Sequence, residues 1–479
     1  MKKILITLLV VIVATIMSCK KLDTLNEDTK SATKVPSATL FSNAMKNLLD
    51  QETTPSVNSN VFRAFSQYWT ETTYTDECNY DVLNRKIPDY EFRTIYRDVL
   101  ADLKEAKRVS DGESEVVSTA AVKKNRAAIT EILTVYAYQR LVDIFGNIPY
   151  DQSLDISNVL PVYDDAKTIY AKLFVRLDAA IADLNTSEAS FGDADLIYAG
   201  DVASWKTFAY SLKLKMGITV ADVTELDPAG KITSAVTGGV FTSASESASF
   251  QYLGASPNTN PVYVELVASG RHDWVATNTM VDIMDTLNDP RMNDYFDSNM
   301  GAGVYLGGTY GASNTYANFT HITPTVQDPT RVSLLLDYTE VQFYLAEAAA
   351  RGLIGGSAET YYNEGITSSI LYWGGTSAEA TVYLLNPAVA YTTAPGTYKQ
   401  KIAVQAWIAY YDRGLIGWTT WRRLDAPILN PPPGKTNADI PTRFTYPIGE
   451  QTLNGANYTA AAAAVGGDKL TTKLFWDKY

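Results

Sequence analysis

The stretch ITEILTVYAYQRLVDIFGNIPY, residues 129–150, sets the pattern of the fold. Its side chains recur every three or four residues, the spacing of one face of an α-helix, and form a stripe of Ile129, Ile132, Leu133, Tyr136, Arg140 and Leu141. Phe145-Gly146 ends the pattern, because glycine readily adopts the backbone conformation that closes a helix. We therefore expect a long helix over residues 123–143 with one buried face.

The same periodicity appears on both sides of this stretch. Further helices are predicted, most of them joined by short connections, over residues 37–51, 164–184, 202–220, 336–351, 358–373 and 398–413. Residues 222–332 differ, since Gly, Ser, Asn, Thr and Pro dominate there and helical stripes are few. The sequence thus predicts a mostly α protein of paired helices with a loop-rich subregion that holds a few short strands.

Composition excludes several classes of protein. The chain has 479 residues, 46% hydrophobic and 19% charged, which is ordinary for a soluble globular protein and wrong for a disordered chain or a multi-span membrane protein. Its net charge of −13 opposes a phosphate backbone, so we expect no nucleic-acid partner. Two cysteines and two histidines are too few for a Cys/His zinc site, so we assign no metal ligands and expect no cofactor, while a metal site built on oxygen ligands stays open.

Sharp catalytic motifs are missing from the sequence. It contains no G-x-S-x-G, G-x-x-x-x-G-K or H-E-x-x-H pattern. A glycoside hydrolase needs only two suitably spaced carboxylates, and the 53 acidic residues leave that alternative open, with Glu71, Asp76 and Asp273 as candidates near aromatic rings. The first expectation is nevertheless a protein that is not an enzyme.

The N-terminus has the pattern of an export signal. Lys2 and Lys3 precede a mainly apolar run over residues 4–16, which is shorter than the roughly 20 residues that a membrane-spanning helix needs. Ile16-Met17-Ser18-Cys19 resembles a bacterial lipobox, so we expect residues 1–18 to be removed and Cys19 to be lipidated. An ordinary secreted protein is the alternative. Residues 19–36 are polar and predict a tether, and Cys78 would remain as a buried free thiol.

Several motifs in order along the chain resemble those of one family, the SusD/RagB nutrient-binding lipoproteins of Bacteroidetes, in their second, SusD-like branch. The motifs are Asn26–Thr29, Leu40–Ala44, Asp143–Tyr150, Pro161–Asp165, Tyr198–Asp201, Trp205–Ala209, Thr286–Arg291, Asp337–Val341, Trp421–Arg423 and Arg443–Pro447. The resemblance implies a tetratricopeptide-like scaffold of helix pairs. It implies one domain over residues 37–479, with the scaffold in 37–221 and 333–479 and the ligand side in 222–332.

The resemblance also implies a function. A member of this family is a lipid-anchored protein of the outer membrane, facing the cell surface, that binds an oligosaccharide and delivers it to a SusC-like TonB-dependent transporter. A peptide or another nutrient is the alternative cargo.

Aromatic residues outside the helical stripes are the candidate ligand-binding positions. The chain has 31 tyrosines and 8 tryptophans, whose flat rings stack on the apolar face of a sugar while polar neighbours bind its hydroxyls. Three segments combine such rings with polar residues, namely residues 68–80, 271–274 and 305–316, and the resemblance places ligand loops there. The expected ligand-binding residues are Trp69, Tyr74, Asn79, Tyr80, Arg271, Trp274, Tyr305, Tyr310 and Tyr316.

For individual rings the alternative is the hydrophobic core. Tyr68 and Trp69 also suit the end of a helix, and Trp205, Trp407 and Trp421 lie on or beside helical stripes, which favours packing. For His272 and His321 the sequence favours ordinary hydrogen bonding.

Overall fold

Paired helices build most of the structure. The computed structural model describes Lys2 and residues 34–479, so the expected signal sequence, Cys19 and most of the tether lie outside the described residues. The longer helices are α3 (Ser37–Thr53), α6 (Ala101–Asp111), α7 (Ala120–Phe145), α8 (Ala166–Asp183), α9 (Val202–Thr219), α10 (Pro228–Gly238), α12 (Asn278–Leu287), α14 (Tyr338–Ala350), α15 (Ala358–Trp373), α17 (Tyr398–Ala409) and α18 (Gly414–Leu424).

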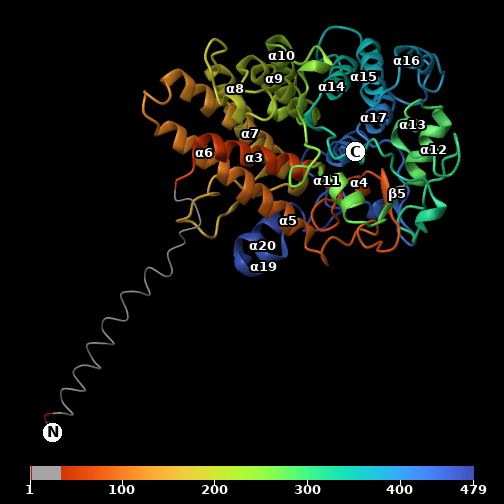
Figure 1. Ribbon diagram of the computed structural model, residues 1–479, viewed down its shortest axis with the longest axis horizontal. Coiled ribbons are helices and arrows are strands. Elements are labelled where there is room, and N and C mark those ends of the chain that lie inside the picture. The colour runs from red at the N-terminus through yellow and green to blue at the C-terminus, as the bar shows by residue number, and fades with distance from the viewer. Residues whose placement is uncertain (1, 3–33) are drawn as a thin grey trace. The chain divides into compact units, whose positions relative to one another are not determined.

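Helices that follow one another in the sequence pack together. Figure 1 shows α7 beside α8, α9 beside α10 and α14 beside α15, and each of these pairs is in close contact. Every helix predicted from periodicity is present, with its ends shifted by a few residues. Just over half of the chain is helical, which confirms the predicted mostly α class.

Local sequence signals explain where the main helices begin and end. The side chains of Thr119, Asp165, Asp201 and Asp337 accept backbone N–H groups in the first turns of α7, α8, α9 and α14. At the other end of α7, Gly146 has a φ of 83°, a conformation that disfavours residues with a side chain. These signals are local, which is why the sequence predicted these ends well.

The subregion over residues 222–332 is more helical than predicted. Helix α10 begins at Pro228, directly after Asp227, and α12 begins at Asn278, directly after Thr277. The side chains of Asp227 and Thr277 each accept a backbone N–H from the first turn of the helix that follows. The short length of these helices gave a weak periodic signal. The shorter helical segments include α4 (Phe62–Phe65), α5 (Ile87–Arg93), η2 (Thr94–Leu100), α11 (Pro261–Tyr263), η6 (Val264–Ala268), α13 (Met292–Tyr295), α16 (Ser377–Leu384), α19 (Ile448–Leu453) and α20 (Gly455–Ala464).

The described residues form three small antiparallel sheets of two strands each. Their pairs are β1 (Trp69–Glu71) with β5 (Trp274–Ala276), β2 (Ile148–Pro149) with β3 (Tyr163–Asp164), and β4 (Ala248–Phe250) with β6 (Ser333–Leu336). A two-stranded sheet is barely stable alone, so each depends on the helices around it. The pairs β1–β5 and β4–β6 join segments that lie far apart in the sequence, which periodicity could not reveal.

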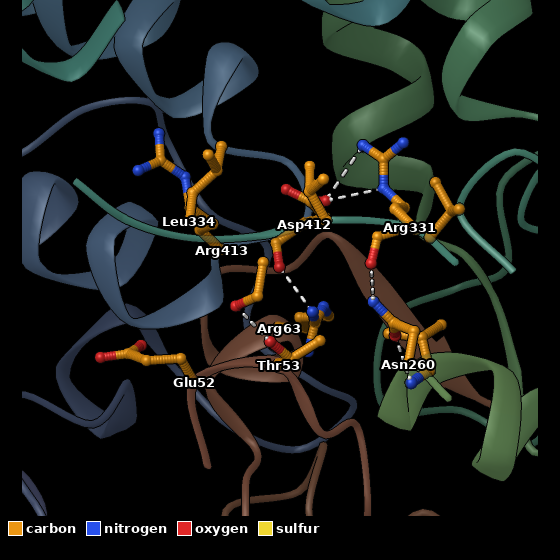
Figure 2. A pocket seen from close by; sticks show the side chains of 12 residues that line it. Glu52, Thr53, Arg63, Asn260, Arg331, Leu334, Asp412 and Arg413 are labelled. Carbon is orange, nitrogen blue, oxygen red and sulfur yellow. Dashed lines mark hydrogen bonds and ion pairs between the residues drawn. The ribbon is translucent and has the colours of Figure 1, made fainter. Parts of the chain in front are cut away.

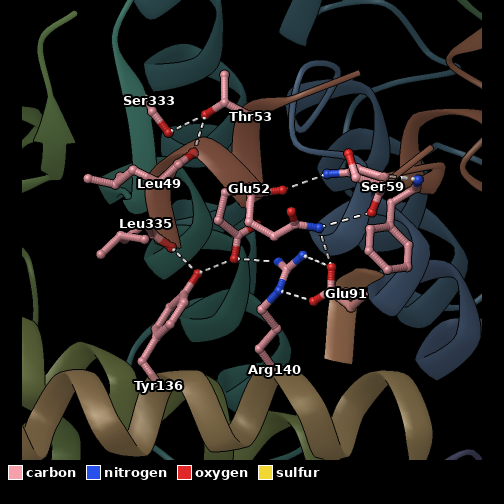
Figure 3. Close-up of polar contacts among 12 residues, drawn as sticks. Leu49, Glu52, Thr53, Ser59, Glu91, Tyr136, Arg140, Ser333 and Leu335 are labelled. Atoms are coloured by element: carbon pink, nitrogen blue, oxygen red, sulfur yellow. Dashed lines mark hydrogen bonds and ion pairs between the residues drawn. The ribbon is translucent and has the colours of Figure 1, made fainter. Parts of the chain in front are cut away.

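A buried ionic cluster ties the first helices together. Figure 3 shows Arg140 of α7 between Glu52 of α3 and Glu91 of α5. Arg140 Nε and Nη2 lie 2.6 and 3.0 Å from the Glu91 carboxylate oxygens, and Nη1 lies 2.7 Å from Glu52 Oε1. Burial alone would lower the pKa of Arg140, but the two carboxylates raise it above its usual value, so the guanidinium stays charged. Tyr136 donates to Glu52 and to the Leu335 carbonyl, which extends the cluster to β6.

Ser37–Tyr479 forms one compact unit, and its hydrophobic core extends from α3 to the C-terminal segment. Trp205 and Trp407 are fully buried in it, as predicted, whereas Trp421 is only half-buried. Cys78 is buried with a free thiol.

Candidate ligand-binding site

The β1–β5 pair brings two of the three predicted segments together. Glu71 pairs with Trp274, so the loop after β1 and the loop before β5 leave the sheet at the same end. Thr72 joins these loops, because its backbone N–H donates to the Asp273 carbonyl over 2.9 Å and its hydroxyl donates to the His272 carbonyl over 2.7 Å. The ligand loop that the resemblance places at this segment is therefore a strand over residues 69–71.

The third segment, residues 305–316, lies against the same end of the sheet. The backbone N–H of Asn314 donates to the Thr72 carbonyl over 2.8 Å, and its side-chain amide donates to the Glu71 carbonyl over 3.0 Å. The amide of Asn79 donates to the Gly311 carbonyl over 2.8 Å. Segments more than 200 residues apart in sequence thus form one surface.

Four of the predicted ligand rings lie in the core. Trp69 is 0% exposed, and Tyr80, Trp274 and Tyr310 are buried. Trp69 packs on Trp274 with ring centroids 6.1 Å apart, and Tyr80 packs on Tyr310 at 6.3 Å. Because their faces are covered by protein, these rings support the loops and do not offer a stacking surface. This corrects their expected role.

The remaining predicted residues lie at or near the surface. Tyr74 is 63% exposed, the Arg271 side chain is 51% exposed, and Tyr316, Tyr305 and Asn79 are half-buried. The side-chain amide of Asn79 donates to the Thr75 carbonyl in its own loop and to the Gly311 carbonyl, so Asn79 mainly stabilises the contact between these two loops. Tyr305 donates its hydroxyl to Asn293 over 2.5 Å and packs on Phe296, which attaches it to the α13 region.

Both histidines of the chain stack on Tyr316. The ring centroids of Tyr316 and His321 are 3.7 Å apart, and those of Tyr316 and His272 are 4.3 Å apart, with interplanar angles of 15° and 21°. The expectation from the sequence was ordinary hydrogen bonding, and His321 Nε2 does lie 3.0 Å from the Tyr316 carbonyl oxygen. The sequence did not predict the stack. The one sequence feature that points to it is that both histidines lie in the loop-rich subregion.

Charge at this surface is locally balanced. Arg271 Nε lies 2.5 Å from Asp273 Oδ2. Asp273 raises the pKa of Arg271, with smaller contributions from Glu265 and Tyr74, so the side chain is a permanent cation. An exposed guanidinium and carboxylate beside exposed rings suit a ligand with both hydroxyls and apolar faces.

The carboxylates considered for a glycosidase do not form a catalytic pair. Glu71 is 1% exposed and accepts the Cys78 backbone N–H, whereas Asp76 is exposed. Burial, and then the neighbouring Glu77 carboxyl, raise the pKa of Glu71 to about 9. Glu71 is therefore a neutral buried acid under the loops. In the part of the chain that the structure describes, no group of three or more His, Cys, Asp or Glu side chains is arranged to hold a metal ion.

A second buried cluster lies next to strand β1. Figure 2 shows Arg63, Arg331 and Asp412 around a small pocket. The volume of this pocket is about 20 Å³. Arg63 donates to the Asp412 carbonyl over 2.5 Å, and Arg331 lies 3.1 Å from the Asp412 carboxylate. The Arg63 guanidinium also lies 5.0 Å from the centre of the Trp69 ring. This cluster connects the C-terminal helices to β1 and to the loop-rich subregion.

Comparison with known proteins agrees with this architecture. The chain is similar to a solved chitin-binding protein, with 24% identity, a TM-score of 0.79 and coverage of 92% of this chain and 100% of that one. It is similar to a chitin-binding SusD homolog from Flavobacterium johnsoniae (21% identity, TM-score 0.77, coverage 91% and 98%) and to a SusD-like protein from Bacteroides thetaiotaomicron (24%, 0.76, 92% and 99%). At these identities the structures establish the fold.

No curated protein matches the sequence. Among the helices of the described residues, none is both long enough and apolar enough to cross a membrane. A family model described as starch-binding and associating with the outer membrane matches residues 28–447. The resemblance found in the sequence is thereby confirmed over most of the chain, and the protein belongs to the SusD-like family.

Proposed function

We propose that this protein is a non-enzymatic nutrient-binding lipoprotein at the cell surface, which captures an oligosaccharide and delivers it to a SusC-like TonB-dependent transporter. The observation that carries the proposal is the surface of Tyr74, Arg271 and the Tyr316 stack, built from three distant segments in a chain of the SusD-like family. Two of the similar solved proteins are named as chitin-binding, which supports a glycan as the cargo.

The chemistry of this surface suits a sugar. Tyr74 offers an exposed ring for the apolar face of a pyranose, and the exposed His272 ring offers a second flat surface on the loop before β5. Arg271 and Asp273 supply a donor and an acceptor for ring hydroxyls at the same place. An open surface of this kind favours weak, reversible binding, which a delivery protein needs.

Binding of defined glycans tests the proposal. Isothermal titration calorimetry with maltoheptaose and with the hexamer of N-acetylglucosamine should detect binding of at least one of them. Tyr74→Ala should weaken that binding by roughly fivefold, the equivalent of about 1 kcal/mol for one stacked ring. Tyr479→Ala is the matched control, because Tyr479 is an exposed tyrosine at the C-terminus. Equal losses in both variants would argue against a site at Tyr74.

The two alternatives have separate readouts. Peptide cargo would appear as retention of peptides, with no affinity for either glycan, when the purified protein is incubated with a casein digest. A surface glycoside hydrolase would release reducing ends from a bound glycan over a long incubation. We expect no release of reducing ends, because Asp273 is paired with Arg271, Glu71 is buried and protonated, and Asp76 is exposed.

The proposal includes the anchor and the partner. Residues 1–18 would be the signal peptide, Cys19 the lipidated residue, 19–36 the tether and 37–479 the binding domain. Cys19→Ser should release the exported protein from the outer-membrane fraction. The wild-type protein, extracted in mild detergent, should copurify with a TonB-dependent transporter. Recovery of the protein without a transporter would contradict the proposed partnership.

A further inference from the structure

A polar groove of about 370 Å³ lies between helix α3, the α5–η2 segment and residues 257–265. Figure 1 shows α3, α5 and α11 close together in this part of the molecule. The groove has the size of a small-molecule site, and none of the residues that line it belongs to the surface around Tyr74. We call it the α3–α11 groove.

Its wall offers hydrogen-bonding groups that the protein itself does not use. Among the described residues, the hydroxyls of Ser56, Thr94 and Thr259 have no side-chain hydrogen-bond partner, and each lines the groove. The Tyr90 ring is 40% exposed at the edge, with Arg93 packed over it at 4.9 Å from the ring centre. Free hydroxyls together with one exposed ring are the groups that bind a saccharide.

The charge of the groove is acidic. Lys46 lies 2.5 Å from Asp50, and Arg97, outside the groove, lies 2.6 Å from Asp98, so these two carboxylates are paired. Glu265 has no basic partner within ion-pair distance in the part of the chain that the structure describes. One half-buried carboxylate is therefore available to a ligand.

Glu265 of the groove lies near Arg271 of the loop site, the surface formed by Tyr74, Arg271 and the Tyr316 stack, because its carboxylate, after that of Asp273, contributes to the raised pKa of Arg271. The Ser269 hydroxyl donates to the Glu265 carbonyl over 2.5 Å and accepts the Arg271 backbone N–H over 3.1 Å. One hydroxyl thus bridges the backbone of the groove residue Glu265 and that of the loop-site residue Arg271. Glu265 and Arg271 are therefore near enough for one chain-like ligand to contact both.

We propose that the α3–α11 groove is a second saccharide subsite, which takes a sugar unit carrying a free amino group and binds its ammonium through Glu265. This inference rests on the proposed function, since it requires a glycan at the loop site. A partly deacetylated chitin-type chain has the required chemistry, because it combines N-acetylated units with units that bear an ammonium group. An anionic sugar would be repelled by the same carboxylate.

Calorimetry with two glycans of equal length tests this inference. The probes are the hexamer of glucosamine and the hexamer of N-acetylglucosamine, at pH 6 and low salt. We expect Glu265→Gln to weaken binding of the glucosamine hexamer by roughly three- to tenfold and to leave binding of the N-acetylated hexamer within about twofold. Thr259→Val, which removes a hydroxyl and keeps the shape, should weaken both. Glu188→Gln is the control, since Glu188 is an exposed acid on another loop.

The outcomes separate the two proposals. Binding of the N-acetylated hexamer that depends on Tyr74 but shows no selective loss in Glu265→Gln would overturn the subsite and leave the proposed function intact. Binding of neither hexamer would overturn the subsite and count against a chitin-type cargo at the loop site. Equal losses for both hexamers in Glu265→Gln would also overturn the assigned role, because the carboxylate would then not recognise the ammonium.

Discussion

The ring of Tyr316 stacks on the ring of His321, with centroids 3.7 Å apart and planes within 15° of parallel. Its other face is covered by His272. A sugar therefore cannot stack on Tyr316 unless one imidazole moves, and the exposed outer ring of the stack belongs to His272. The stack also fastens the loop before β5 to the segment that ends at His321.

Tyr316→Ala should uncouple these two loops. We expect faster amide hydrogen exchange over residues 269–273 and 316–321, because both imidazoles lose the ring between them. Global stability should change little, since Tyr316 is only half-buried. Tyr74→Ala is the comparison: it should weaken ligand binding without altering exchange at these residues. Unchanged exchange in Tyr316→Ala would show that other contacts hold the loops.

Trp69→Ala should destabilise the protein by about 3–5 kcal/mol, the usual effect of removing a fully buried large aromatic ring. Urea denaturation followed by circular dichroism measures this loss. Tyr74→Ala should stay within about 0.5 kcal/mol of the wild type, because its ring is 63% exposed. If Trp69→Ala kept full stability and lost only ligand affinity, Trp69 would have to be a ligand-contacting ring after all.

Arg140→Met should destabilise the fold by about 3–5 kcal/mol, because Glu52 and Glu91 would keep their buried charges without a partner. The double variant Arg140→Met/Glu91→Gln should recover part of this loss. Denaturant unfolding measures both, with Arg97→Met as the control, since the Arg97 side chain is 65% exposed. A double variant no better than the sum of its single changes would argue against direct coupling between the two side chains.

Glu71→Gln should flatten the dependence of stability on pH. Burial and the Glu77 carboxyl raise the pKa of Glu71 from 4.5 to about 9, so between these values the folded protein keeps a proton that the unfolded chain has lost. The contribution of Glu71 is complete below pH 4.5 and is lost as the pH rises through 9. The free energy of unfolding, measured from pH 5 to 9, should therefore fall less steeply in the variant. Parallel curves would show that Glu71 titrates normally in the fold.

The helical scaffold was predictable because its signals are local. Periodic stripes, caps such as Asp201 and a stop at Gly146 act within a few residues, and the helix ends differ from expectation only slightly. The short helices α10 and α12 were missed because about ten residues carry too little periodicity. Strand β1 was missed because its pairing partner lies some 200 residues away.

The sequence alone determined the class of the fold, the family and the three segments that form the candidate site. Only the tertiary structure decided which aromatic rings reach the solvent, because a ring such as Trp69 has the same local pattern whether it faces a ligand or the core. The pairing of β1 with β5 buried Trp69 and Trp274 and left Tyr74 exposed. The same folding brought both histidines onto Tyr316, since such contacts depend on distances between chain segments that no spacing in the sequence records.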